Sequence, residues 1–366
     1  MKIRKFTLFL ILVLCLVVTL QLVTENNLAD ASFNSTKSSI VSADPPLIVP
    51  PSMASGNLPE KKYVTSDINN PPSVLSGVPK LPIPNDPYIE KQWALDRMQV
   101  SEAWQITGRD SEVLVAVLDT GIDRNHEDLI NKVVLEVNFT DSPTPGDIHG
   151  HGTHIAGIIA AQGDNGLGVV GISQGSYLMN VKVADDKGRC QASTVAEGIV
   201  WAVDNGAKVI NISIELKDSS PELQEAVDYA WNQGAVIIAA AGNDCSELPV
   251  YPAYYENCIA VAATNQDDKL APLSNHGDWV DVAAPGFNIY STVPDDSYDY
   301  KSGTSSATAY VSGLAALLFD LVIDSDGDGK LNDEVRLAIE AGCEEIAING
   351  VGTGQINIAH SLAGIS

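Results

Sequence analysis

The amino-acid sequence predicts an α/β fold, a doubly wound and mostly parallel sheet with helices on both faces. Short, almost continuous apolar runs recur along the chain, and such runs are typical of strands buried on both faces. Segments with helical signals alternate with these runs, which favours a parallel sheet covered by helices on both sides. One predicted helix is apolar all round, so it must be buried in a large domain or lie in a membrane.

The predicted elements follow one another from residue 112 onward. The strands are "EVLVAVLD" (112–119), "AKVINISI" (207–214), "AVIIAAAGN" (235–243) and "CIAVAAT" (258–264). The helices are "THIAGIIAA" (153–161), "PELQEAVDYAWNQG" (221–234) and "SATAYVSGLAALLFDLV" (306–322). The second helix has Pro near its start and Gly past its end, as helix boundaries often do. The third opens with Gly-Thr-Ser-Ser and contains Gly313, which favours a buried helix over a membrane span.

Length and charge limit the class of protein. The 366 residues are enough for one large α/β domain or two ordinary ones. The net charge is -26, and the acidic residues are concentrated after residue 83. Such an acidic body repels phosphate backbones, so we expect no nucleic-acid partner.

The first part of the chain reads as a leader followed by a linker. Basic residues precede an apolar run from Phe6 to Val23, and Ala-Asp-Ala follows at the spacing of a signal peptidase site. We therefore expect a signal peptide over 1–31 and a secreted protein, with an uncleaved membrane anchor at 6–23 as the alternative. Residues 32–83 are rich in Pro, Ser and Asn and predict an unstructured pro-segment or linker. Residues 84–366 then form the folded domain.

Export makes the cysteines of that domain candidates for disulfides. The four are Cys190, Cys245, Cys258 and Cys343, which allow three pairings. Cys245 and Cys258 flank one short loop and are the best single pair. The alternative is that all four are free thiols.

Polar residues that suit acyl transfer stand at strand ends and helix starts. Asp119 and Asn243 end two strands, and His151 and Ser305 begin two helices. Active residues collect at such positions in open parallel sheets. Each residue has a simpler role alone, as a turn residue or as a helix N-cap in the case of Ser305. Together they provide a nucleophile, a base, an orienting carboxylate and an oxyanion donor.

At this point the sequence resembles the subtilisin-like serine proteases. The segments "VAVLDTGID", "HGHGTHIAGIIAA", "AAAGN" and "SGTSSATAYVSG" are similar to that family's Asp, His, oxyanion-hole and Ser motifs, in the family's order. The start "PNDPYIEKQWALDRM" resembles the thermitase branch. The resemblance implies a serine endopeptidase of polypeptides, monomeric, with Asp119 as orienting carboxylate, His151 as base, Ser305 as nucleophile and Asn243 as oxyanion donor. A transpeptidase or cyclase, or an inactive binding module on the same fold, remains the alternative.

The resemblance also implies where the substrate binds. It assigns the substrate-binding residues Ser213, Ile214, Glu215, Ala241 and Gly242. The family pattern Ser-Leu-Gly-Gly is changed here, because Glu215 and Leu216 replace both glycines. Glu215 is expected at the rim of the first specificity pocket, where it either favours basic side chains or points to solvent. The bond between Tyr251 and Pro252 is expected to be cis.

Calcium is the cofactor that the sequence indicates. By resemblance, a first site uses Asp86, Asp128, Asn165 and the carbonyls of Leu167 and Val169, and hard oxygen ligands of this kind suit calcium.

A second signal is "DSDGDGKLNDEV" (324–335), in which Asp324, Asp326, Asp328 and Gly329 match the first half of an EF-hand loop. Its twelfth position is Val335, and Glu334 lies one residue early. The loop is therefore expected to be either a calcium-bound turn that uses Asn332 or Glu334, or an Asp/Gly-rich turn without metal.

Overall fold

The computed structural model describes residues 81–108 and 111–365. The expected leader and most of the expected linker lie outside the described residues. No helix among the described residues has both the length and the apolar character needed to cross a membrane.

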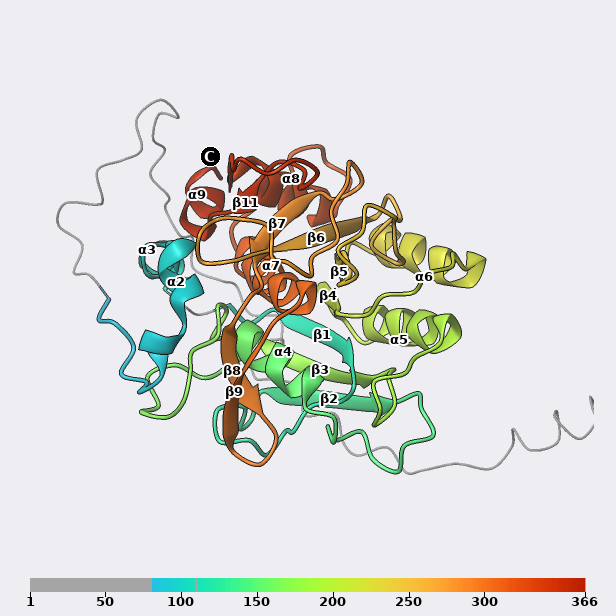
Figure 1. The fold of residues 1–366 in the computed structure, drawn as a ribbon, viewed down its shortest axis with the longest axis horizontal. Helices are drawn as coiled ribbons and strands as arrows, with labels where there is room; N and C mark the ends of the chain where they lie inside the picture. The colour runs from blue at the N-terminus through green and yellow to red at the C-terminus, as the bar shows by residue number, and fades with distance from the viewer. Residues whose placement is uncertain (1–80, 109–110, 366) are drawn as a thin grey trace, which may run out of the picture. The chain divides into compact units, whose positions relative to one another are not determined.

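The core of the fold is a nine-stranded sheet (Figure 1). Its strands are β1 (Leu114–Asp119), β2 (Val133–Asn138), β3 (Tyr177–Lys182), β4 (Val209–Ile212), β5 (Val236–Ala240), β6 (Cys258–Thr264), β7 (Val282–Pro285), β10 (Cys343–Glu344) and β11 (Gln355–Ile356). They lie in the order β10-β11-β7-β6-β5-β4-β1-β3-β2. All pairs in this sheet are parallel except β10 with β11. The predicted doubly wound, mostly parallel sheet is therefore confirmed.

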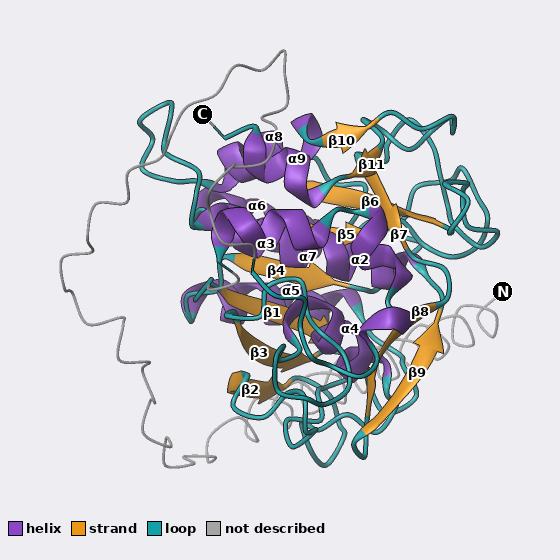
Figure 2. Ribbon diagram, turned by 90° about the vertical axis from the view of Figure 1, so that its left-hand side faces the viewer, coloured by secondary structure: helices purple, strands orange, loops and turns teal. Residues whose placement is uncertain are grey.

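Helices cover both faces of this sheet (Figure 2). They are α2 (Trp93–Arg97), α3 (Val100–Thr107), α4 (His151–Ala160), α5 (Ala192–Asp204), α6 (Pro221–Asn232), α7 (Thr304–Phe319), α8 (Asn332–Ala341) and α9 (Ile358–Ala363), with a short 3-10 helix η2 (Ile89–Lys91). Helices α4 and α7 pack on one face, and α5 and α6 pack on the other. A two-stranded antiparallel hairpin, β8 (Ile289–Val293) and β9 (Ser297–Lys301), leads into α7.

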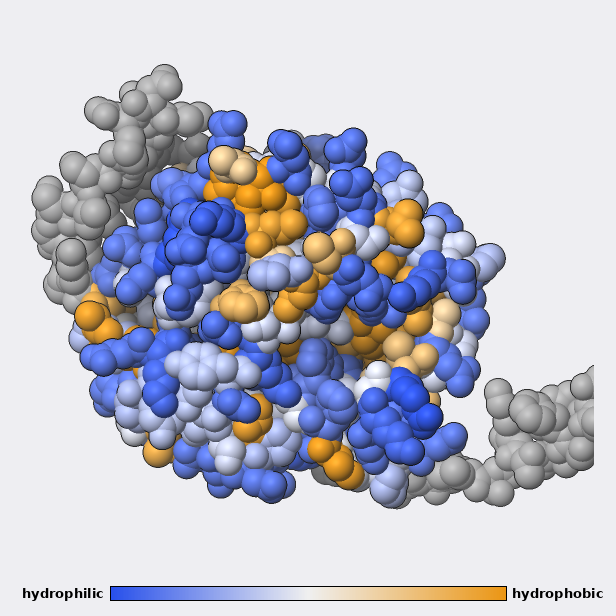
Figure 3. Space-filling model, viewed as in Figure 1, coloured by the Kyte–Doolittle hydropathy of each residue, from blue (hydrophilic) through white to orange (hydrophobic). Residues whose placement is uncertain are grey.

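Side chains along the central strands alternate between the two faces of the sheet, and this alternation explains why the strand sequences are apolar throughout. In β5, Val236 and Ile238 pack into the cluster with α4 and α7, whereas Ile237 and Ala239 pack into the cluster with α5 and α6. Successive strand residues point to opposite faces, so a strand covered on both sides needs an apolar residue at every position. The face of the molecule in Figure 3 is in contrast mostly hydrophilic, with apolar residues in small groups.

The helix that carries Ser305 is buried almost along its whole length. Helix α7 begins at Thr304 and has Gly303 at its N-cap, so the interpretation of Ser305 as an N-cap is wrong. Gly313 lets α7 approach its neighbours, because a Cβ there would lie 2.6 Å from the Cβ of Ile172. This close approach is the packing reason for a glycine in the middle of the helix.

The cysteines do not form the expected bridge. Cys190, Cys245, Cys258 and Cys343 are all free thiols. Cys258 is buried in β6, whereas Cys245 is exposed on a loop, so the proposed pair of Cys245 with Cys258 is wrong. The Tyr251-Pro252 peptide bond is cis, as the sequence predicts.

Candidate active site

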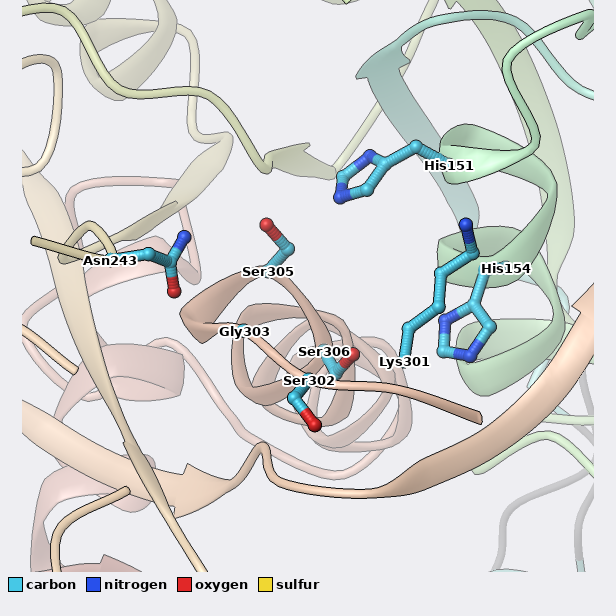
Figure 4. Close-up of a pocket in the computed structure, with 8 residues that line it drawn as sticks. All are labelled: His151, His154, Asn243, Lys301, Ser302, Gly303, Ser305 and Ser306. Carbon is cyan, nitrogen blue, oxygen red and sulfur yellow. The ribbon is translucent and has the colours of Figure 1, made fainter. Parts of the chain in front are cut away.

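A cavity of about 400 Å³ lies where the helices α4 and α7 begin. Its lining residues are His151, His154, Asn243, Lys301, Ser302, Gly303, Ser305 and Ser306. Figure 4 shows the Ser305 hydroxyl pointing into the space between the Asn243 amide and the His151 ring. The fold thus brings three of the four predicted catalytic residues to one cavity, and Asp119 lies directly behind His151.

Asp119 holds the imidazole of His151 in place. The Nδ1 atom of His151 lies 2.7 Å from Oδ1 and 2.9 Å from Oδ2 of Asp119. Asp119 ends β1 and is buried, whereas His151 begins α4 and its side chain is 25% exposed. A ring nitrogen facing a carboxylate carries the proton, so Nε2 of the neutral ring is free to accept one.

The pKa of His151 is raised above its ordinary value. Burial of the ring opposes protonation, but the negative charge of Asp119 and its hydrogen bond outweigh that effect. Lys301 lowers this pKa and Asp147 raises it, each by its charge. The imidazolium form is therefore favoured by the carboxylates around it.

Asp147 is a buried residue beside the site that the sequence motifs do not indicate. Its Oδ1 accepts hydrogen bonds from the Thr120 hydroxyl (2.9 Å) and the Gly150 amide (2.8 Å). Its Oδ2 accepts from the amide and the hydroxyl of Thr153, at 2.9 and 2.7 Å. It thereby binds the first turn of α4 to the loop after β1, which fixes His151 relative to Asp119. The sequence feature that could have indicated this residue is its position, an aspartate four residues before the start of α4.

Asn243 is oriented by Thr304, the residue before Ser305. The Asn243 Oδ1 accepts hydrogen bonds from the Thr304 amide (2.9 Å) and the Thr304 hydroxyl (3.3 Å). Because the oxygen is held by these donors, the Nδ2 amide group faces the cavity (Figure 4). A side-chain donor beside the Ser305 hydroxyl suits an oxyanion that forms there.

The other histidines near the site are unsuited to act as the base. His154 is buried, its Nε2 lies 3.0 Å from the Ile289 carbonyl oxygen, and burial lowers its pKa to about 3. His149 is exposed, and its ring centroid lies 6.3 Å from that of His151. His151 alone combines a carboxylate partner with access to the cavity.

Two segments face each other beside the cavity. The predicted substrate-binding residues Ser213, Ile214 and Glu215 follow β4, and Ala241 and Gly242 follow β5. The Glu215 Oε2 atom accepts a hydrogen bond of 2.9 Å from the Asn243 amide, so the interpretation that Glu215 points to solvent is wrong. A Cβ at Gly242 would lie 2.7 Å from the same Oε2 atom. Gly242 has a φ of +99°, a backbone conformation that favours glycine, and a Cβ there would lie even closer to the Asn275 Nδ2 atom.

Two buried carboxylates lie at the first expected calcium site. Asp86 and Asp128 are both buried, and the Asp86 Oδ1 atom has no hydrogen-bond partner. Burial, with a smaller contribution from the charge of Asp128, raises the pKa of Asp86. The Asn165 amide and the Val169 backbone N–H each donate 2.8 Å hydrogen bonds to Asp128. Leu167 is exposed on the same loop. This negatively charged, oxygen-rich set fits a hard cation.

The second expected site differs from the EF-hand pattern. Asp324 and Asp326 lie together as expected, but Asp328 pairs with Lys330 at 2.8 Å. The third carboxylate of the cluster is Glu334. Asp328, which the EF-hand spacing also assigns to the metal, is not one of the three carboxylates grouped in this structure.

An α/β sheet that brings a serine, a histidine with its carboxylate and an amide donor to one cavity is typical of serine hydrolases. A family model described as "Subtilase family" matches residues 110–335, so the chain belongs to the subtilase family. It is 44% identical over 272 residues to thermitase of Thermoactinomyces vulgaris, covering 74% of this chain and 94% of that protein. It is 42% identical over 280 residues to a thermophilic serine proteinase of Bacillus sp. (strain AK1), covering 75% of this chain and 68% of that protein. Subtilisin BL of Lederbergia lenta is 40% identical to the chain over 227 residues, covering 62% of this chain and 83% of that protein. The chain is a thermitase-like serine endopeptidase.

Proposed function

We propose that this endopeptidase is secreted and cleaves polypeptides through an acyl-enzyme, with Asp119, His151 and Ser305 as its triad. The observation that carries the proposal is the His151 Nδ1 atom 2.7 Å from Asp119, at the cavity that Ser305 lines. That pairing leaves Nε2 as the proton acceptor.

The proposed reaction starts with the Ser305 hydroxyl. His151 Nε2 takes its proton while Oγ forms a bond to the carbonyl carbon of the substrate. The carbonyl oxygen becomes an oxyanion and receives hydrogen bonds from the Asn243 Nδ2 group and the Ser305 backbone N–H. The C–N bond then breaks, and His151 gives its proton to the leaving amine. Water repeats the sequence on the acyl-enzyme and releases the carboxylic acid.

Several further assignments belong to this proposal. Residues 1–31 are the signal peptide, 32–83 the pro-segment or linker, and 84–366 the catalytic domain, which acts as a monomer. Calcium is held by Asp86, Asp128, Asn165 and the carbonyls of Leu167 and Val169; its charge would neutralise the two buried carboxylates. Ser213, Ile214, Glu215, Ala241 and Gly242 form the substrate cleft, with Glu215 facing the first specificity pocket.

Labelling of the nucleophile tests the catalytic assignment. A fluorophosphonate probe should label the wild-type enzyme and the Ser302→Ala variant, but not Ser305→Ala. Ser302 is the matched control, because it lines the same cavity while its hydroxyl accepts a 2.9 Å hydrogen bond from the Asn288 amide. His151→Ala should lose activity by orders of magnitude, and His149→Ala should keep it. Normal peptide hydrolysis by Ser305→Ala would refute the proposal.

Product analysis separates hydrolysis from acyl transfer. Mass spectrometry of a digest in the presence of an added peptide amine should show mainly carboxylic acid products. If ligated products dominate instead, the transpeptidase alternative replaces the hydrolase proposal.

A further inference from the structure

A second cation site is suggested by the loop that joins α7 to α8. Its backbone turns tightly around Asp324, and Gly327 and Gly329 have φ angles of +83° and +84°. The Asp324 carboxylate accepts a 2.7 Å hydrogen bond from the Gly327 amide and a 2.9 Å bond from the Gly329 amide. The loop is therefore folded around a carboxylate.

Three carboxylates converge on this loop. One oxygen from each of Asp324, Asp326 and Glu334 lies within 4.8 Å of the others. Asp324 and Asp326 are exposed, but Glu334 is only 9% exposed. Like charges this close repel one another, and a cation between them would remove that repulsion.

The Glu334 carboxylate has one satisfied and one unsatisfied oxygen. Its Oε1 atom accepts hydrogen bonds from the amide and the hydroxyl of Ser325, at 2.7 and 2.8 Å. Its Oε2 atom is buried and has no hydrogen-bond partner. A buried carboxylate oxygen without a partner is costly, and a bound cation removes that cost.

The loop holds too few cations of its own to balance this charge. Its lysine, Lys330, pairs with Asp328 at 2.8 Å. Asp333, next to Glu334, also has a buried oxygen without a partner. The carboxylates at the centre of the cluster therefore have backbone and hydroxyl donors but no cationic side chain of the loop paired with them.

We infer that Asp324, Asp326 and Glu334 bind a calcium ion, in a site separate from the active site and from the Asp86 site. Calcium suits the cluster because it accepts carboxylate, carbonyl and water oxygens in flexible geometry. The twelfth-position glutamate of an EF-hand loop is replaced here by Glu334, which reaches the cluster from the first turn of α8. The ion then joins the end of α7, the helix that carries Ser305, to the start of α8.

Calcium titration of the full-length protein tests this inference. The Ser305→Ala background prevents self-digestion, and calorimetry of the chelator-treated protein counts the ions bound. The double variant Asp324→Asn/Asp326→Asn should bind one ion fewer, and Glu334→Gln should bind that ion at least tenfold more weakly. Glu225→Gln, an exposed carboxylate on α6, should behave like the background protein. An Asp86→Asn/Asp128→Asn variant should keep the ion, which separates this site from the first.

Unchanged stoichiometry and affinity in the double variant and in Glu334→Gln would overturn the inference. The carboxamides keep the size of the side chains and remove like-charge repulsion, so the variants should fold in chelator. If the double variant does not fold, the calcium affinity of the Glu334→Gln variant tests the inference alone. An unchanged calcium affinity in that variant would overturn the inference.

Discussion

The carboxylate of Glu215 is hydrogen-bonded to the backbone amide of Asn243, with Oε2 2.9 Å from the nitrogen. This bond joins the segment after β4 to the segment after β5. It places a negative charge next to the residue that we propose as the oxyanion donor. A side chain of the substrate that enters between the two segments therefore meets a carboxylate.

Glu215 should favour substrates with Lys or Arg before the cleaved bond. Glu215→Gln should lower kcat/KM for such peptides roughly fivefold relative to peptides with Phe there, since a partly exposed ion pair contributes about 1 kcal/mol. Matched fluorogenic peptides measure the ratio, and Glu197→Gln, an exposed glutamate on α5, is the control. An unchanged ratio would remove Glu215 from the specificity pocket.

The pH at which the acid limb of the pH–rate profile lies should depend on the charges around His151. Catalysis needs the neutral imidazole, so activity falls as pH decreases through the raised pKa of His151. Lys301→Gln removes a charge that lowers this pKa, so the acid limb of kcat/KM should move to higher pH. Asp147→Asn removes a charge that raises it, so the limb should move to lower pH. Lys301→Arg keeps the charge and should leave the limb in place, and a shift of the same sign in all three variants would contradict this account.

Calcium at the Asp86 site should stabilise the fold. Binding to the native state alone adds about 2.7 kcal/mol when free calcium is 100 times Kd. Asp86→Asn should therefore lower the melting temperature in calcium but have little effect in chelator, because Asp86 Oδ2 can keep accepting the 2.9 Å hydrogen bond from the Asp164 amide. Melting curves in calcium and in chelator measure this, with exposed Asp96→Asn as the control. Equal calcium responses in Asp86→Asn and wild type would argue against this site.

His154 should make the protein unstable in acid. Burial lowers its pKa to about 3 in the folded state, whereas an unfolded His titrates near about 6.5. Between these values the unfolded state binds more protons at His154, so the contribution of this residue to the free energy of unfolding decreases as pH falls below about 6.5, by about 2 kcal/mol at pH 5. Denaturant titrations of Ser305→Ala at pH 7 and pH 5 measure the loss.

His154→Gln in the same background should reduce the difference between the two pH values by about 2 kcal/mol. It should also lower stability at pH 7, because it disturbs the 3.0 Å contact of Nε2 with the Ile289 carbonyl. Exposed His149→Gln is the control. An unchanged pH dependence in His154→Gln would mean that other groups cause the acid instability.

Sequence alone predicted the sheet because its strands are buried on both faces. Full burial leaves apolar residues at every position, and that pattern is visible without a structure. The four catalytic candidates could be located because chemistry in such sheets collects at strand ends and helix starts. The structure brings Asp119 and His151 into hydrogen-bond contact and places Ser305 and Asn243 at the same cavity.

Side-chain directions and distances could not be predicted from the sequence in the same way. Asp147 lies in a loop, and its contacts with Thr120 and Thr153 depend on how that loop folds against α4. The pairing of Cys245 with Cys258 was argued from the expected secretion and from sequence distance, neither of which sets the geometry that a bridge requires. Asp328 fits the EF-hand spacing, but a lysine two residues later competes for its carboxylate.

Helix α7 is buried from Thr304 to Leu318. Amide hydrogens in such a helix exchange with deuterated solvent only through the largest openings of the structure. The amides of α7 beyond its first turn, which are hydrogen-bonded within the helix, should therefore be among the slowest to exchange in the described part of the chain, whereas active-site residues on surface loops commonly exchange early. Displacement of Ser305 from its position in the active site should accordingly coincide with global unfolding, without an earlier stage in which the protein is folded but inactive.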